Sequence, residues 1–201
     1  MAGCFLGEVH LEMLDDGQSM VLLKGFTYID PRCQPWPVPT GAKTDGASIP
    51  RFLWSIIGGP FEGRYRKPAI VHDFHCDVRL CKWEDVHRMF YEAMLTADVD
   101  STKAKLLYFG VRLGGPRWTS QASYNSSLVI PPDRLDPKGI TFNSGGGGSN
   151  YHPGYLPNPR KEVYKGYRSK VSAQLDSMSL DDIDKLADEA RQEVQSKPIF
   201  G

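Results

Sequence analysis

The sequence has 201 residues, and 24 lysines and arginines balance 24 aspartates and glutamates, so the formal net charge is zero. This balance argues against broad electrostatic binding to nucleic acid or anionic membranes, and we find no signal for sequence-specific nucleic-acid binding. No apolar run reaches the roughly 18 residues that a membrane span needs, and the N-terminal residues lack the pattern of a secretion signal. Four scattered cysteines predict reduced thiols rather than a disulfide framework.

The N-terminal part of the chain predicts strands. Residues 4–30 combine loosely alternating apolar positions with turn residues at 15–18, which indicates two strands joined by a turn. Residues 31–41 surround Trp36 with four prolines. Because proline is excluded from helix interiors and from central strands, we expect an extended loop there.

Helix signals follow in the middle of the chain. Ser48 can cap a first helix that ends before Gly58. Apolar residues at helical spacing, with glycine and proline stops, predict three more helices over residues 68–79, 83–97 and 101–112.

The tail has a different character. Residues 119–160 hold few apolar side chains, many prolines and a run of glycines, which is typical of a mobile linker. Further on, Ser179 and Asp182 make a cap-like start for an amphipathic helix. Its narrow apolar stripe needs a cover, from the main domain or from another protein, and we favour a partner. The stripe consists of Ile183, Leu186, Ala187, Ala190 and Val194.

The most concentrated chemistry lies between His72 and Asp85. On a helix, His72 and Cys76 share a face, while Asp73 lies about 100° round from His72. A short connection makes the two helices of this region antiparallel neighbours, which would bring Asp85 beside His72. A carboxylate there would orient the imidazole for general-base catalysis, and Asp73 would remain free to hold a cation or a substrate group.

Two other interpretations of this region stay open. A histidine followed by an aspartate on a helix often forms a structural hydrogen-bond network. A metal site is the second alternative, although no CxxC or HExxH spacing is present. Its candidate ligands are His72, His75, Cys76, Cys81 and His87.

A second dense motif covers residues 44–51. Its structural interpretation is strong, because Asp45 with Gly46 suits a turn and Ser48 suits a helix cap. In the functional interpretation, Asp45, Ser48 and Arg51 line a cleft beside His72. No elbow motif supports Ser48 as a nucleophile.

At these residues the chain resembles the phage and prophage proteins grouped as domain of unknown function 1353 (DUF1353). Their pattern is an early strand pair, T-D-x-A-S-x-P-R, A-x-x-H-D-x-x-Y, an acidic A-D-x-x-F helix, and a last helix ending near G-x-x-W. The resemblance covers about residues 4–118, and the tail from residue 119 lies outside it. This chain departs from the pattern in having Cys76 at the aromatic position and Val86-His87 after the aspartate.

The same region is also similar to the His-Asp helix pair of secreted and viral phospholipase A enzymes. That similarity implies that His72 activates water, that Asp73 binds Ca²⁺ and that Asp85 orients His72. The glycine-rich calcium loop and the disulfides of those enzymes have no counterpart in this sequence.

We therefore expect an α+β fold, with a small antiparallel sheet packed by three or four helices, followed by a linker and a terminal helix. The expected divisions are a globular domain (1–118), a linker (119–160) and a helical arm (161–201).

For function, the first hypothesis is a structural or accessory phage virion protein. It would be found in the virion, or in the host cytoplasm during assembly, and residues 145–201 would dock on other virion proteins. The alternative is a phage-encoded hydrolase of lipid or cell-envelope material that uses His72, Asp73 and Asp85.

Overall fold

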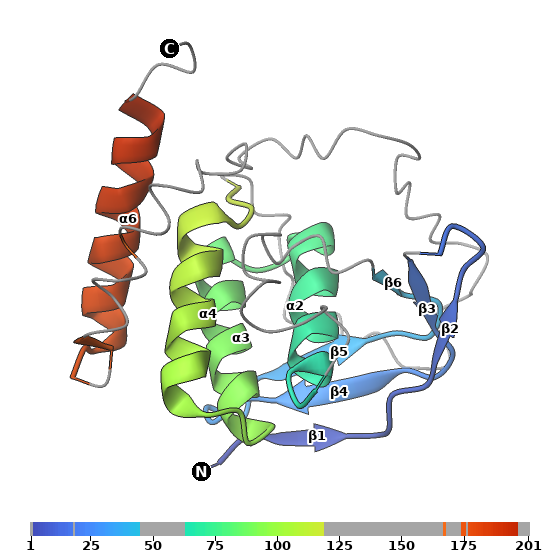
Figure 1. The fold of residues 1–201 in the computed structure, drawn as a ribbon. Coiled ribbons are helices and arrows are strands. Elements are labelled where there is room, and N and C mark those ends of the chain that lie inside the picture. Colours follow the sequence, from blue (N-terminus) through green and yellow to red (C-terminus); the bar gives the residue numbers. More distant parts are fainter. Residues whose placement is uncertain are drawn as a thin grey trace.

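Two small sheets and four helices make up the described part of the molecule, which confirms the expected α+β class (Figure 1). Three of the helices lie side by side next to the sheets, and the fourth, α6, lies against α4 (Figure 1). Among the described helices, none is both long enough and apolar enough to cross a bilayer. The computed structural model describes residues 2–17, 19–44, 63–118, 167, 174–175 and 177–196, apart from the side chains of 194 and 195.

Six strands form two antiparallel sheets of three strands each, with β4 and β3 as the central strands. The first sheet has the order β1 (Cys4–Leu6), β4 (Phe26–Ile29) and β5 (Pro35–Val38), and the second has the order β2 (Leu11–Met13), β3 (Met20–Leu22) and β6 (Lys43–Thr44).

The two strands expected over residues 4–30 are divided into four, because the chain crosses between the sheets at two glycines. Gly7 follows β1 with a φ of 98°, a conformation that side-chain-bearing residues rarely adopt. Gly25 precedes β4, where a Cβ atom would lie 3.0 Å from the carbonyl oxygen of Val38. Local alternation of apolar residues does not reveal these crossings.

The proline-rich segment is not only a loop, because residues 35–38 form strand β5 at the edge of the first sheet. Trp36 and Val38 are buried, whereas the prolines at 35 and 37 are exposed. Prolines two residues apart lose their N–H groups on the same side of the strand, and an edge strand needs donors on one side only. The prolines therefore do not prevent strand formation here, because β5 pairs with only one neighbouring strand.

Asp30 holds the turn between β4 and β5. Its buried carboxylate accepts hydrogen bonds from the backbone N–H groups of Arg32 and Gln34, at 2.8 and 2.9 Å, and from Trp36 Nε1 at 3.3 Å. A carboxylate with several donors is well satisfied in a buried position.

The three central helices confirm the predictions for this region, with shifts of one or two residues at their ends: α2 (Arg66–Val78), α3 (Trp83–Thr96) and α4 (Ser101–Gly114). α2 ends at Arg79, which adopts a left-handed conformation with φ 54°. α4 begins at Asp100, whose side chain accepts the N–H of Lys103.

Two hydrophobic clusters lie on either side of α3. One contains buried side chains of the sheets and of α2 and α3, including Tyr28, Trp36, Ile70 and Met89. The other joins α3, α4 and α6. α3 contributes to both clusters, which explains why its buried face is wide.

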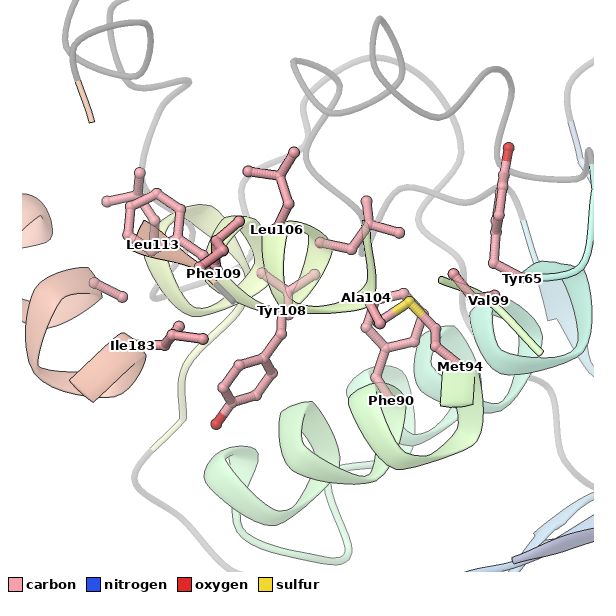
Figure 2. Packing of buried hydrophobic residues seen from close by; sticks show 14 of the residues in the cluster. Tyr65, Phe90, Met94, Val99, Ala104, Leu106, Tyr108, Phe109, Leu113 and Ile183 are labelled. Atoms are coloured by element: carbon pink, nitrogen blue, oxygen red, sulfur yellow. The ribbon is translucent and has the colours of Figure 1, made fainter. Parts of the chain in front are cut away.

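α6 (Leu180–Ser196) packs on the main domain of its own chain. Ser179 and Asp182 form the predicted reciprocal cap: the Asp182 N–H donates to Ser179 Oγ, and the Ser179 N–H donates to Asp182 Oδ2. Figure 2 shows Ile183 pointing from α6 toward α4, and Ile183, Ala187 and Ala190 have no exposed surface. These three residues of the apolar stripe, which we expected a partner to cover, thus pack on α4 of the same chain, and Leu186 is partly buried there.

Charged side chains join the same two helices. Arg112 Nε of α4 lies 2.8 Å from Asp184 Oδ1, and Tyr108 Oη donates to the same carboxylate oxygen at 2.7 Å. In return, Arg191 of α6 donates to the carbonyl groups of Leu113 and Gly115 at the end of α4. A cation at the C-terminus of a helix also interacts favourably with the helix dipole.

Several predictions lie outside the described residues. These are the helix beginning at Ser48, the linker over residues 119–160 and most of residues 145–179.

Candidate site around His72

His72 and Cys76 lie one turn apart on α2 and face α3, as their spacing predicted. The Cys76 Sγ atom is 3.5 Å from His72 Nε2. Both side chains are buried, with exposed fractions of 0% for His72 and 2% for Cys76. These two side chains therefore lie in the interior of the molecule.

The residue that meets His72 from α3 is His87. Nδ1 of His87 and Nε2 of His72 are 2.8 Å apart, a hydrogen-bond distance, and His87 also has no exposed surface. One of the two nitrogens must carry the proton and the other must accept it. Phe90 packs on the His72 ring with a centroid distance of 4.7 Å.

Burial keeps both imidazoles neutral. It lowers the pKa of His72 to about 3, with a further contribution from His75. It also lowers the pKa of His87 well below its ordinary value, and the charges of Arg112 and Arg117 act in the same direction. These two guanidinium groups stack on the Trp83 ring at 4.5 and 4.3 Å from its centroid.

Asp85 does not pair with His72. It is exposed, whereas the next two residues of α3 are buried, and no hydrogen bond joins Asp85 to His72 in the described part of the chain. The wide buried face of α3 includes His87 but leaves Asp85 outside. The expected orientation of the imidazole by a carboxylate at this position is not formed.

Asp73 connects α2 to the second sheet. Its Oδ2 accepts a hydrogen bond of 2.6 Å from Thr44 Oγ1 of β6, and its exposed fraction is 4%. Asp73 does not belong to the group of metal-ligand side chains found among the described residues. This location gives no support to the expectation that it holds Ca²⁺ or a substrate group.

Asp45, Ser48 and Arg51, which we expected to line a cleft, lie outside the described residues.

His75 occupies a separate buried position next to this cluster. Its ring makes edge contacts with Trp36 and Phe74 at centroid distances of 5.1 and 5.2 Å. Burial lowers its pKa to about 4, against a smaller opposing effect of the Pro37 carbonyl group. Neither ring nitrogen makes a regular hydrogen bond within the described structure.

The donor atoms in the cluster are typical ligands of transition metals. His72, Cys76 and His87 each offer one atom, and these atoms lie within 4.8 Å of one another. Imidazole and thiolate suit zinc and copper, whereas Ca²⁺ requires oxygen ligands. The described residues contain no other group of three such side chains.

Sequence reasoning placed His87 among the candidate metal ligands but missed it as the partner of His72. A signal was available: the family pattern A-D-x-x-F puts its aspartate three residues before the phenylalanine. Counted back from Phe90, that position is 87, where this chain has histidine. The two departures from the pattern, Cys76 and His87, thus both contact His72.

Comparison with known proteins supports the sequence resemblance. The chain is 44% identical over 111 residues to the uncharacterized protein y4jT of Sinorhizobium fredii, covering 55% of this chain and 33% of that relative. It is 40% identical over 116 residues to the uncharacterized protein y4iH of the same strain, covering 57% of this chain and 48% of that relative. The chain therefore matches half or less of each relative's length.

No solved structure matches the chain. The family model that matches is described as a protein of unknown function, and it covers residues 20–111, from β3 to α4 and including His72, Cys76 and His87. Residues 20–111 of the chain thus match the model of the DUF1353 family.

Proposed function

We propose that this protein is a structural or accessory component of a phage or prophage particle, and that its polar centre is part of the scaffold. The observation that supports a structural role for this centre is the burial of His72, which has no exposed surface and is paired with another neutral imidazole. The phage or prophage particle is proposed from the resemblance of residues 4–118 to phage and prophage proteins. The protein would occupy the virion, or the host cytoplasm while particles assemble.

The same geometry does not favour the hydrolase. A general base needs to reach a water molecule and a substrate, and it works best with a pKa near the working pH. Burial lowers the pKa of His72 to about 3, and Asp85 lies on an exposed face of α3. His72 has no exposed surface and a lowered pKa, so in the described structure it meets neither the requirement for access nor the requirement for a suitable pKa.

Partner subunits would contact residues 145–201. Within that range, Ile183, Ala187 and Ala190 of α6 already pack on α4, so a partner would meet the other face of this helix. That face is polar and mainly acidic, with exposed residues Asp181, Asp182, Lys185, Glu189 and Gln192. We therefore expect a contact that weakens at high salt.

The test is to find the chain in particles. Full-length protein carrying a tag is produced in cells that assemble the particle, and gradient-purified particles are quantified by immunoblot. We expect incorporation of the wild type and reduced incorporation of Glu189→Lys. Glu12→Lys, at an exposed position on β2, is the matched control and should be incorporated normally.

A parallel assay addresses the alternative function. Purified protein is incubated with phospholipid vesicles or peptidoglycan, with and without Ca²⁺. Absence of the chain from particles, together with hydrolysis that is lost in His72→Ala, would overturn the structural role and favour the enzyme.

A further inference from the structure

The cluster of His72, Cys76 and His87 contains a ring nitrogen that the described hydrogen bonds leave without a partner. Of the four ring nitrogens, His72 Nε2 and His87 Nδ1 satisfy each other. His87 Nε2 makes no regular hydrogen bond, although it is fully buried. Buried polar atoms are normally satisfied, so an unused donor or acceptor here needs an explanation.

The distance between Cys76 Sγ and His72 Nε2 is close to that around a tetrahedral metal ion, and all three ligand atoms lie within 4.8 Å of one another. Zinc bonds of about 2.0–2.1 Å to nitrogen and about 2.3 Å to sulfur place two nitrogens about 3.3 Å apart, and a nitrogen and a sulfur about 3.6 Å apart. The observed distance between Cys76 Sγ and His72 Nε2 is 3.5 Å. The two nitrogens, at 2.8 Å, would have to separate slightly.

The second nitrogen of His87 fits the same arrangement. If Nδ1 binds a metal ion, the ring proton must lie on Nε2. That atom lies beside the backbone at the end of α4, where a Cβ atom on Gly115 would lie 3.2 Å from it, and the Pro116 backbone acts to raise the pKa of the same ring. Metal-binding histidines usually donate their other N–H to a carbonyl or carboxylate.

We propose that His72 Nε2, Cys76 Sγ and His87 Nδ1 bind one transition-metal ion of the zinc or copper class, which links α2 to α3. On binding, the Cys76 thiol gives its proton to solvent. The hydrogen bond between the imidazoles is replaced by two metal–nitrogen bonds, and the proton of that bond moves to the other nitrogen of the ring that carried it, so that each ring stays neutral with its proton on His72 Nδ1 or His87 Nε2. Because the ion is buried, its role is structural, and binding stabilises the folded state. This inference does not depend on the proposed virion role.

The experiment uses full-length protein, treated with EDTA and then titrated with Co²⁺ as a spectroscopic substitute for Zn²⁺. We expect one equivalent to bind, with the visible bands of tetrahedral Co²⁺ and a near-ultraviolet sulfur-to-cobalt charge-transfer band. Zn²⁺ should displace the Co²⁺. Elemental analysis of protein purified without EDTA shows whether zinc or copper is the ion carried.

Variants identify the ligands. Cys76→Ser should lose the charge-transfer band, and His87→Gln should weaken binding by more than the roughly 10–100-fold caused by losing an outer partner of a ligand. Cys81→Ser is the matched control, because Cys81 is a partly buried cysteine close to α2 and outside the cluster. It should keep both the band and the affinity.

Some results would overturn the site. Folded wild type without the charge-transfer band would do so, as would an equal loss of the band in Cys81→Ser and Cys76→Ser. If the Cys76 and His87 variants do not fold, X-ray absorption on Zn²⁺-loaded wild type decides, since it should find one sulfur at about 2.3 Å and nitrogens at about 2.0 Å. Oxygen and nitrogen alone around the ion would contradict the proposal.

Discussion

At the scale of single residues, the identity of position 87 determines the chemistry of this centre. An aspartate there would place a charged acceptor beside His72 and could orient it as a base. Histidine instead gives a neutral pair in which each ring needs the other's lone pair or proton. Helical spacing alone could not assign His87 this role, because spacing places a residue on a helix face but does not say which residue of the facing helix it meets; the only signal was the position of the aspartate in the family pattern.

Thr44 and Asp73 provide a test at this scale. Thr44→Val keeps the side-chain shape but removes the 2.6 Å hydrogen bond to the buried Asp73 carboxylate. We expect a loss of about 1.5–3 kcal/mol in the free energy of unfolding, measured by urea denaturation. Thr27→Val in β4 is the control, because Thr27 makes no hydrogen bond through its hydroxyl group in the described structure. Equal effects of the two changes would show that the bond to Asp73 contributes nothing.

At the scale of elements, helices were predicted better than strands for a physical reason. Side-chain caps mark the starts of α4 and α6, and periodic apolar residues mark all three of α3, α4 and α6; both are local signals. The strand β5 depends on its position at the edge of a sheet, and the division of the first strands depends on crossings between sheets. Both are properties of the assembled fold, so they could not be seen in the local pattern.

The α4–α6 contact gives a prediction for one element. Ile183→Ala removes apolar atoms from a fully buried position and should lower the free energy of unfolding of the whole domain by about 2–5 kcal/mol. Lys185→Ala, on the exposed face of the same helix, should change it by no more than about 0.5 kcal/mol. Thermal and urea unfolding measure both. A small effect of Ile183→Ala would indicate that α6 leaves α4 in solution and is free to bind elsewhere.

At the scale of the whole molecule, three neutral histidines lie in the packed interior, and this makes stability depend on pH. Burial lowers the pKa of His72 and His75 from the ordinary 6.5 to about 3 and about 4, and that of His87 well below 6.5. As pH falls below 6.5, the unfolded chain binds protons that the folded chain does not. Stability is therefore complete above this pH and decreases below it, by about 1.4 kcal/mol per pH unit for each imidazole.

Urea unfolding in EDTA, at several values from about pH 7.5 to about pH 5, measures this dependence. We expect the free energy of unfolding to fall steadily as the pH drops below 6.5. Replacing His75 by glutamine should make the decline less steep, because one of the three imidazoles is removed. A flat profile would mean that these side chains reach solvent in the folded protein.

The most direct test of the buried His72–His87 pair is nitrogen NMR of the imidazole rings in metal-free, folded protein. We expect His72 and His87 to stay neutral from about pH 7.5 to about pH 5.5. At the contact between the two rings, one nitrogen should be protonated and the other unprotonated. If His72 takes up a proton within this range, the buried and neutral pair of imidazoles is wrong.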